Sequence, residues 1–494
     1  MRNKILLSGR IDLGPIGRHG LSFLSTIQKD QRNEVWLDAD YVSKEDLKKI
    51  IGNTRNLNFT NDRSKEFDFL IYFSVLGITP TDEWYDKALS KNSKIKICYP
   101  VFDGTVPPLE WIEKINSNFD ICCSPSEYVS HNLRRHGVTI DCFGLECCIL
   151  IENLLKCQHK NTDKFRFGCV SGNEARKNLK FLIESFSETF SKDEPVELFI
   201  HSVDRPNLLT PYNELLETAI NANKKSNIIL HNDFVSQDDM DDIWRSFDAY
   251  VIPQKNTGYY TTPAEGIACG IPVILSDIPV HREFTKYIDE KNNLFFAKHP
   301  FYTSEYHFVF DYRNLGISFS SLHEIYKKIF REIYEKRSFL NSPDLVSKRK
   351  EAVKAFLPKN LSKKHNIVIH PSRIAVAKKV SHLDENGTFF MSEKLAKKYE
   401  AFGFGKLESI EDNYQEAIYP EEQSPVFQAL EQTAVESQKI WLKMYENSKE
   451  NILSSKWMKK LLHRAEKSGV NRLPRFVYRA FSLYCKTKKL FKRK

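Results

Sequence analysis

The feature that most constrains this chain is the segment 247–284, FDAYVIPQKNTGYYTTPAEGIACGIPVILSDIPVHREF. It predicts a short apolar strand from Ala249 to Ile252, a loop, a short helix, and a second apolar strand from Pro272 to Leu275. Pro263 suits the first helical position, where the missing N–H has no partner to lose. Gly270 suits the helix end, where a left-handed backbone is needed.

One carboxylate, Glu265, lies a turn into this predicted helix. A helix that starts at the carboxyl edge of a parallel sheet is a common ligand site in open α/β folds. Its free N–H groups and positive dipole end favour an anion such as a nucleotide diphosphate. An equally weighted alternative is that Thr262 and Glu265 form a capping box, in which Glu265 only bonds back to the start of the helix.

Strands and helices alternate along most of the chain, which predicts an α/β protein built from two Rossmann-like units. The predicted strands of the first unit cover residues 4–8, 35–37, 67–74, 94–99 and 120–124, and those of the second cover 165–170, 196–203, 227–230, 249–252 and 272–275. Helices are predicted at 177–186 and 322–334, and Ser236 is predicted to cap another. Beyond residue 375 the alternation stops and the sequence predicts mainly helix.

The chain of 494 residues is too long for one core and suggests about three domains. No segment approaches the roughly 20 apolar residues of a membrane-spanning helix, and the N-terminal apolar run is too short for a signal peptide. These features predict a cytoplasmic protein. Its ten cysteines show neither zinc-site spacing nor a disulfide framework, so reduced thiols are expected.

The positive charge is concentrated at the C-terminus. Residues 451–494 hold fourteen Lys and Arg and one acid, so they carry +13, whereas the preceding 450 residues carry −4. From Arg472 to Lys494 the sequence predicts a basic amphipathic helix, which suits an anionic membrane surface. The basic face is Arg475, Arg479, Ser482, Lys486, Lys489 and Arg493, and the apolar face is Leu473, Val477, Ala480, Phe481, Tyr484 and Phe491. Packing of the apolar face on the body is the alternative.

Glu265 and the run Ala268-Cys269-Gly270-Ile271-Pro272-Val273 resemble the nucleotide-sugar signature of retaining GT-B glycosyltransferases, of the group 1 or family 4 type. The resemblance implies two Rossmann-like domains that face each other across a cleft, followed by a mainly helical extension. The predicted boundaries are 1–158 for the acceptor-side domain, 159–375 for the nucleotide-sugar domain, and 376–494 for the extension.

In that family a second Glu of the motif holds the donor ribose, and the resemblance gives this role to Glu265. The first Glu of the motif, near the donor sugar, is replaced by Thr257. The resemblance also predicts donor contacts for four residues, which are Thr257 itself, Gly258, Tyr259 and Thr262. The loop from Gly9 to Gly20 is similar to the family's glycine loop, in which Gly14 and Gly17 are predicted to approach the donor phosphates; an ordinary turn is the alternative.

Lys177 matches a family lysine that neutralises the diphosphate leaving group. The family arginine position holds Asn173, so Arg176 is predicted to supply that charge. Fixed cations stabilise a phosphate charge that develops in an enclosed site. The alternative is a solvated basic pair at a helix start, although cations are disfavoured there unless an anion is present.

Asp103 falls where the family has an acid that faces the cleft, and it could orient the acceptor hydroxyl. An Asp-Gly turn with Gly104 is an equal alternative. Most of the single histidines, a set that includes His19, are interpreted as surface or hydrogen-bonded core residues, and no pair has metal-ligand spacing. We therefore expect neither a metal ion nor a cofactor.

Taken together, these features predict a retaining hexosyltransferase of cell-surface polysaccharide synthesis that is peripheral on the inner face of the membrane. It would move a sugar from a nucleotide-diphosphate donor to a glycan or lipid-linked acceptor, and would bind no nucleic acid. The replacement at Thr257 keeps two alternatives open. One is an inactive relative that binds nucleotide or glycan as an assembly partner, and the other is a nucleotide-sugar epimerase.

Overall fold

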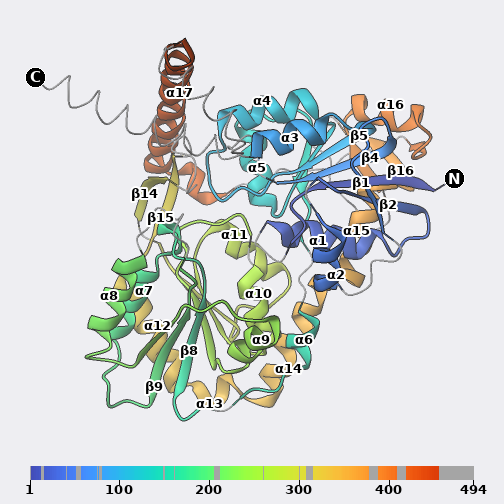
Figure 1. Cartoon of the computed structure of the whole chain (residues 1–494). Helices are drawn as coiled ribbons and strands as arrows, with labels where there is room; N and C mark the ends of the chain where they lie inside the picture. The colour runs from blue at the N-terminus through green and yellow to red at the C-terminus, as the bar shows by residue number, and fades with distance from the viewer. Residues whose placement is uncertain are drawn as a thin grey trace, which may run out of the picture.

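A computed structural model describes residues 2–12, 16–40, 42–51, 57–74, 76, 81–147, 151–160, 162–204, 212–259, 261–299, 301–306, 315–377, 388–408 and 419–454. The described residues form two parallel sheets with helices on both faces of each, and a C-terminal extension that contacts both units (Figure 1). The two predicted Rossmann-like units are therefore present.

The first sheet has seven parallel strands in the order β3-β2-β1-β4-β5-β6-β7. Their bounds are β1 Asn3–Gly9, β2 Asn33–Asp38, β3 Asn58–Thr60, β4 Glu66–Phe73, β5 Asn92–Tyr99, β6 Ile121–Ser124 and β7 Asp141–Gly144. The central strand β4 is almost continuously apolar, as expected for a strand that is covered on both faces.

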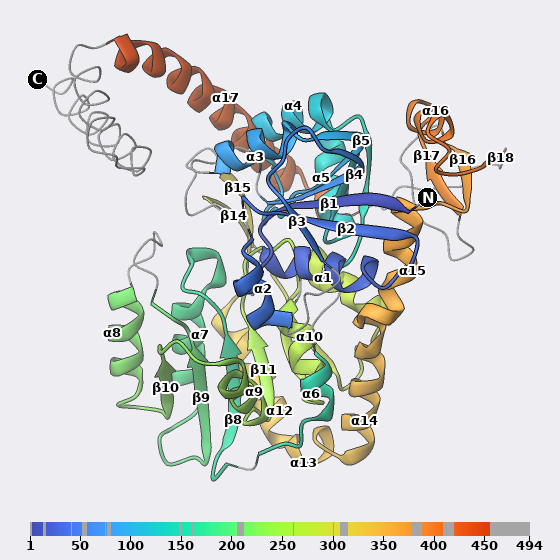
Figure 2. The same cartoon turned by 45° about the vertical axis from the view of Figure 1, so that its right-hand side comes forward.

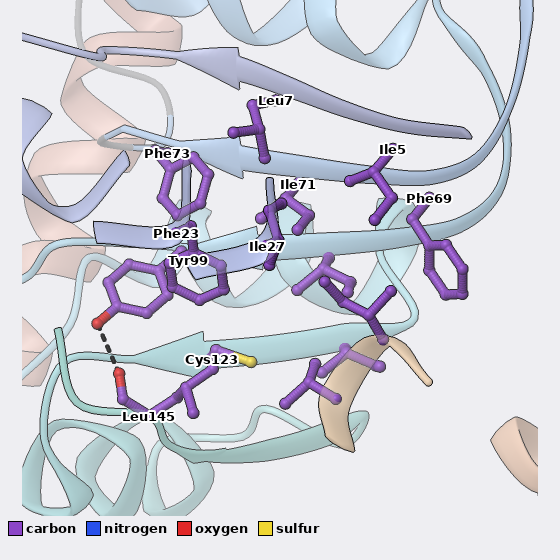
Figure 3. Close-up of a cluster of buried hydrophobic side chains, with 14 of the residues drawn as sticks. Ile5, Leu7, Phe23, Ile27, Phe69, Ile71, Phe73, Tyr99, Cys123 and Leu145 are labelled. Carbon is purple, nitrogen blue, oxygen red and sulfur yellow. Dashed lines mark hydrogen bonds between the residues drawn. The ribbon is translucent and has the colours of Figure 1, made fainter. Parts of the chain in front are cut away.

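Helices cover the two faces of this sheet separately (Figure 2). One face packs on α1 (Gly17–Ile27), α2 (Lys44–Ile51) and α15 (Pro358–Ile369), and the other on α3 (Thr81–Leu89), α4 (Leu109–Asn118) and α5 (Glu127–Arg135). Figure 3 shows Phe23 of α1 among the apolar side chains of the strands, near Tyr99, whose hydroxyl donates a 2.7 Å hydrogen bond to the carbonyl of Leu145.

The second sheet has six parallel strands in the order β10-β9-β8-β11-β12-β13. Their bounds are β8 Phe165–Val170, β9 Val196–His201, β10 Ile228–His231, β11 Ala249–Ile252, β12 Val273–Ser276 and β13 Leu294–Ala297. A separate antiparallel hairpin, β14 (Phe301–Tyr306) and β15 (Leu315–Ser320), follows β13.

The helices of this unit also form two layers. One face packs on α7 (Leu179–Ser187), α8 (Tyr212–Ala222) and α12 (His323–Glu335), and the other on α6 (Glu152–Lys156), α9 (Gln237–Arg245) and α10 (Thr261–Ala268). The predicted cap of α9 is confirmed, because Ser236 and Asp239 form a reciprocal capping box. After α13 (Arg337–Leu340) and α14 (Pro343–Ala352), α15 returns to the first unit and packs on α1.

The extension is mainly helical, as expected, but it also contains strands that the sequence analysis did not predict. The strands β16 (Arg373–Val376), β17 (Thr388–Met391) and β18 (Leu407–Glu408) form a small parallel sheet with α16 (Glu393–Ala401). These strands are only two to four residues long and lie in a charged segment with few β-branched runs, so the sequence does not distinguish them from helix. The helix α16 and strand β17 pack on the core of the first unit.

The last described helix, α17 (Pro425–Ser454), begins between the two units and then projects away from them (Figures 1 and 2). Phe427 at its start is buried against the β14–β15 hairpin, and Glu431 pairs with Arg135 of α5. Gln438 accepts a hydrogen bond from the backbone of Leu109 in α4. The basic segment 472–494 lies outside the described residues.

Candidate functional site

The helix that carries Glu265 starts at the carboxyl edge of the second sheet, as predicted. It is α10, between the parallel neighbours β11 and β12. It begins at Thr261, so Pro263 is its third residue and not its first. Gly270 closes it with the expected left-handed backbone, at a φ of 82°.

Glu265 bonds across the interface between the two units, a contact that a capping box would not make. Its carboxylate, whose side chain is only 8% exposed, accepts a 2.6 Å hydrogen bond from Nη1 of Arg18 in α1. The nearby negative charge of Glu265 raises the pKa of Arg18 above its usual value. Thr262, the expected N-cap, is the second residue of α10.

Asp103 forms the second ionic link between the units. It lies in the loop after β5, and its Oδ2 is 2.7 Å from Nη2 of Arg176, in the short helix Ala175–Lys177 that follows β8. Its Oδ1 accepts a 2.9 Å hydrogen bond from the backbone N–H of Gly258. The Asp103 side chain therefore joins two loops of the other unit, which a simple Asp-Gly turn would not do.

Lys177 lies next to Arg176, at the carboxyl end of the central strand β8. Its ammonium is half-buried and makes no hydrogen bond or ion pair within the described ranges. Burial and, to a smaller extent, the charge of Arg176 lower the pKa of Lys177 to about 8, although Glu174 and Asp103 oppose this shift. A poorly solvated ammonium beside a guanidinium favours an anionic ligand.

We call the five charged residues Arg18, Asp103, Arg176, Lys177 and Glu265 the inter-domain site. The structure thus brings together the predicted Asp103, Arg176, Lys177 and Glu265, which come from loops and helix starts that are far apart in the chain. The sequence analysis did not identify Arg18, although it lies in the glycine loop and directly follows Gly17.

The loop with Thr257, Gly258 and Tyr259 packs tightly on the first unit. A Cβ at Gly258 would lie 2.0 Å from the carbonyl oxygen of Phe102, so only glycine fits there. Tyr259 donates a hydrogen bond to the carbonyl of Cys147. The Thr257 hydroxyl is buried and donates to the Tyr259 carbonyl at 2.9 Å, so it is already satisfied within the loop.

The predicted glycine loop is described only in part. Gly14 lies outside the described residues. Gly17 begins α1, and a Cβ on it would lie 2.1 Å from Oδ1 and 2.4 Å from the backbone nitrogen of Asp12. This close approach explains why glycine is needed at position 17.

His19 differs from the surface or hydrogen-bonded state expected for most of the single histidines. Its side chain is buried, yet its Nδ1 has no hydrogen-bond partner. The ring lies near those of Tyr99 and Tyr259, with centroid distances of 5.3 and 5.6 Å. Burial lowers the pKa of His19 to about 4, with a smaller opposing effect from Asp103.

Further bonds hold the two units together around this site. Glu283, which follows α11 (Pro279–Arg282), accepts hydrogen bonds from the backbone N–H groups of Glu127 and Tyr128 at the start of α5. The hydroxyl of Thr105 accepts one from the backbone of Ile317 in the hairpin. The relative position of the charged groups is therefore fixed by contacts on several sides.

The described residues contain neither a metal-binding cluster nor a membrane-spanning helix. Across the residues that the structure describes, no three His, Cys, Asp or Glu side chains cluster as they would around a metal ion. Within the same ranges, no helix combines the length and the apolar character needed to cross a membrane. The eight cysteines in the described part of the chain are all free thiols.

Residues 164–300 match the family model described as "Glycosyl transferases group 1". None of the curated proteins compared with this chain matches it in sequence. Solved structures with a similar fold include Anabaena Alr3699/HepE in complex with UDP and glucose, which is 11% identical with a TM-score of 0.53, over 74% of this chain and 98% of that one.

Two further structures cover the chain to the same extent. A glycosyltransferase from Rickettsia africae ESF-5 is 14% identical with a TM-score of 0.52, over 74% of this chain and 97% of that one. The sucrose-phosphate synthase from Thermosynechococcus elongatus is 11% identical with a TM-score of 0.50, over 74% of this chain and 98% of that one. The GT-B fold and the resemblance of the second domain to group 1 glycosyltransferases are thereby confirmed.

Proposed function

We propose that this GT-B protein is a retaining hexosyltransferase that moves a sugar from a nucleoside-diphosphate donor to a glycan or lipid-linked glycan acceptor. The observation that carries the proposal is the inter-domain site itself. A buried carboxylate and two adjacent cations lie at the carboxyl edge of one sheet, and an acid from the other domain faces them. Open α/β folds bind their ligands at this edge.

Each charged residue has a proposed role. Glu265 accepts hydrogen bonds from the ribose hydroxyls, which must then replace the guanidinium of Arg18. Arg176 and Lys177 bind the diphosphate and stabilise the charge that grows on it as the sugar–phosphate bond breaks. The reaction as we propose it uses these two cations and no metal ion.

Asp103 is proposed to orient the acceptor hydroxyl once Arg176 turns to the diphosphate. The distance of 2.7 Å between Asp103 and Arg176 means that a bound phosphate and Asp103 compete for the same guanidinium. We further propose front-side attack, in which the acceptor oxygen forms its bond to the anomeric carbon on the face that the phosphate leaves. The departing phosphate then takes the acceptor proton.

A role in cell-surface polysaccharide synthesis at the inner face of a membrane is also part of the proposal. It rests on the charge of residues 451–494, which hold fourteen basic residues and one acid. Deleting residues 472–494 should release the protein from anionic vesicles without changing donor binding, and salt should weaken binding of the full chain. Equal co-sedimentation of the two proteins would contradict this role for the segment.

One observation favours the alternative of an inactive nucleotide-binding relative. Thr257 occupies the position of the missing family Glu, and its hydroxyl is used within its own loop. An inactive relative would bind the donor without consuming it. An epimerase would convert the donor without any acceptor, so incubation with donor alone identifies that function. Turnover in the presence of an acceptor separates the transferase from the inactive relative.

The first experiment is a thermal-shift screen over UDP-, GDP-, ADP- and CMP-sugars. A ligand that binds only the folded protein raises the melting temperature with its concentration relative to Kd. We expect one nucleoside-diphosphate sugar to stabilise the protein, and its nucleoside diphosphate to stabilise it as well. A flat response to the whole panel would contradict the proposed function.

A further inference from the structure

His19 is a buried side chain of the inter-domain region with an unused hydrogen-bonding atom. The residue is 3% exposed, and its Nδ1 has no hydrogen-bond partner. Buried polar atoms are nearly always hydrogen-bonded, because leaving one unpaired costs the free energy of its lost hydration. The Nδ1 of His19 therefore keeps its capacity to hydrogen-bond a group of a bound ligand.

The surroundings of His19 indicate where that partner lies. The imidazole contacts the ring of Tyr99, on the acceptor side, and the ring of Tyr259, in the loop that follows β11. The charges of Asp103 and Arg18 are near enough to act on it in opposite directions. His19 thus belongs to α1 of the first domain and faces the loop that contains Thr257.

The chemistry of the neighbours narrows the choice of ligand group. Arg176 and Lys177 are cations that suit the phosphates, and Glu265 suits the ribose hydroxyls. The burial that keeps His19 uncharged makes it a poor partner for a phosphate but a good one for a neutral hydroxyl, which can donate to or accept from an imidazole. The Thr257 hydroxyl is occupied within its loop.

We propose that Nδ1 of His19 binds a hydroxyl group of the donor sugar and takes over the sugar contact that Thr257 cannot make. This inference rests on the proposed function, because it assigns the sugar-binding group of the same site. His19 then acts as a specificity residue. It distinguishes a nucleoside-diphosphate sugar from the nucleoside diphosphate alone.

The test compares the affinities for UDP and UDP-glucose by calorimetry in wild-type protein and in His19→Phe. GDP and GDP-mannose replace them if the screen selects guanine nucleotides. Phenylalanine keeps a ring beside Tyr99 and Tyr259 but removes both nitrogens. We expect about tenfold weaker binding of the sugar nucleotide and unchanged binding of the nucleoside diphosphate.

Two further variants separate a hydrogen bond from a packing effect. The amide of His19→Asn lies near the position of Nδ1, and that of His19→Gln lies near Nε2. We expect Asn, but not Gln, to restore part of the preference for the sugar nucleotide. This comparison also holds if His19→Phe does not fold.

Several results would overturn the inference. An unchanged ratio of the two affinities in His19→Phe, with or without a lower melting temperature, would mean that His19 is structural. An equal preference for the sugar nucleotide in His19→Asn and His19→Gln would exclude a role for Nδ1. Wild-type protein that binds neither compound of any nucleotide pair would contradict the proposed function, and this inference with it.

Discussion

Nη1 of Arg18 lies 2.6 Å from Oε1 of Glu265, although 247 residues separate them in the chain. Arg18 belongs to the first domain and Glu265 to the second, so the pair closes the interface at the expected ribose position. A nucleotide that uses Glu265 has to displace this guanidinium. The affinity for nucleotide is therefore coupled to the contact between the two domains.

Glu265→Ala should lower nucleoside-diphosphate affinity by about tenfold to a hundredfold, because hydrogen bonds to a charged group contribute roughly 1.5–3 kcal/mol. Glu265→Gln should lower this affinity less than Glu265→Ala does, because the amide keeps one acceptor oxygen but not the charge. Calorimetric titration measures both. If affinity stays at the wild-type value while the melting temperature falls, Glu265 only holds the domains together.

Lys177→Ala should reduce turnover by about a hundredfold or more with little loss of stability, because the lysine stabilises charge that appears as the bond to phosphate breaks. Arg176→Ala should share this loss. Lys180→Ala is the matched control, because Lys180 is an exposed lysine of the following helix α7. Wild-type turnover in both Lys177→Ala and Arg176→Ala would refute the diphosphate assignment.

The pKa of Lys177, lowered to about 8, predicts a pH dependence of donor binding. A bound diphosphate favours the charged ammonium and raises this pKa, so binding near pH 8 should take up protons. Affinity should fall as the pH rises through 8. Calorimetry in buffers of different ionisation enthalpy measures the uptake, and Lys177→Ala should abolish it. Proton uptake that persists in this variant would assign the effect to another group.

The lowered pKa of Lys177 also makes the free energy of unfolding depend on pH. Between about pH 8 and 10.5 the unfolded chain keeps a proton on Lys177 that the folded protein releases. The free energy of unfolding contributed by Lys177 should therefore rise with pH across this window. Comparison of wild-type protein with Lys177→Ala by denaturant unfolding isolates this contribution. A contribution that falls with rising pH would mean that Lys177 is not desolvated.

Gly258→Ala should disturb the interface, because its Cβ would lie 2.0 Å from the carbonyl oxygen of Phe102. The shifts that relieve such an overlap typically lower the free energy of unfolding by about 1–3 kcal/mol. We expect a lower melting temperature and a larger radius of gyration by small-angle scattering. Gly172→Ala is a milder control, since the contacts of its Cβ are with the flexible carboxylate of Glu174. Equal behaviour of the two variants would show that the tight contact at Gly258 is not needed.

Local periodicity was sufficient to predict the two parallel units. Strands such as β4 and β11 are dense in buried apolar residues, and the cap at Ser236 is a local pattern. The strands β17 and β18 were not predicted because they are short and lie in a charged segment with few β-branched runs. Their structure depends on packing against residues that are distant in the chain.

The sequence analysis could predict only those residues of the candidate site that lie within a recognisable local motif. Glu265, Lys177 and Asp103 were found from their local motifs, and the structure brings them near one another. The pairing of Glu265 with Arg18 was not predicted, because it depends on how two domains dock. The unpaired Nδ1 of His19 was missed for the same reason, since only the folded protein shows which polar atoms lack partners.

The most direct test of the proposed function follows a labelled sugar. Donor selected by the thermal-shift screen is incubated with the protein and a glycan or lipid-linked glycan preparation, and the label is located in donor, acceptor or free sugar. We predict that wild-type protein moves the label to the acceptor and that Lys177→Ala does not. Donor that binds but stays unchanged, or that is converted to its epimer without acceptor, would contradict the account.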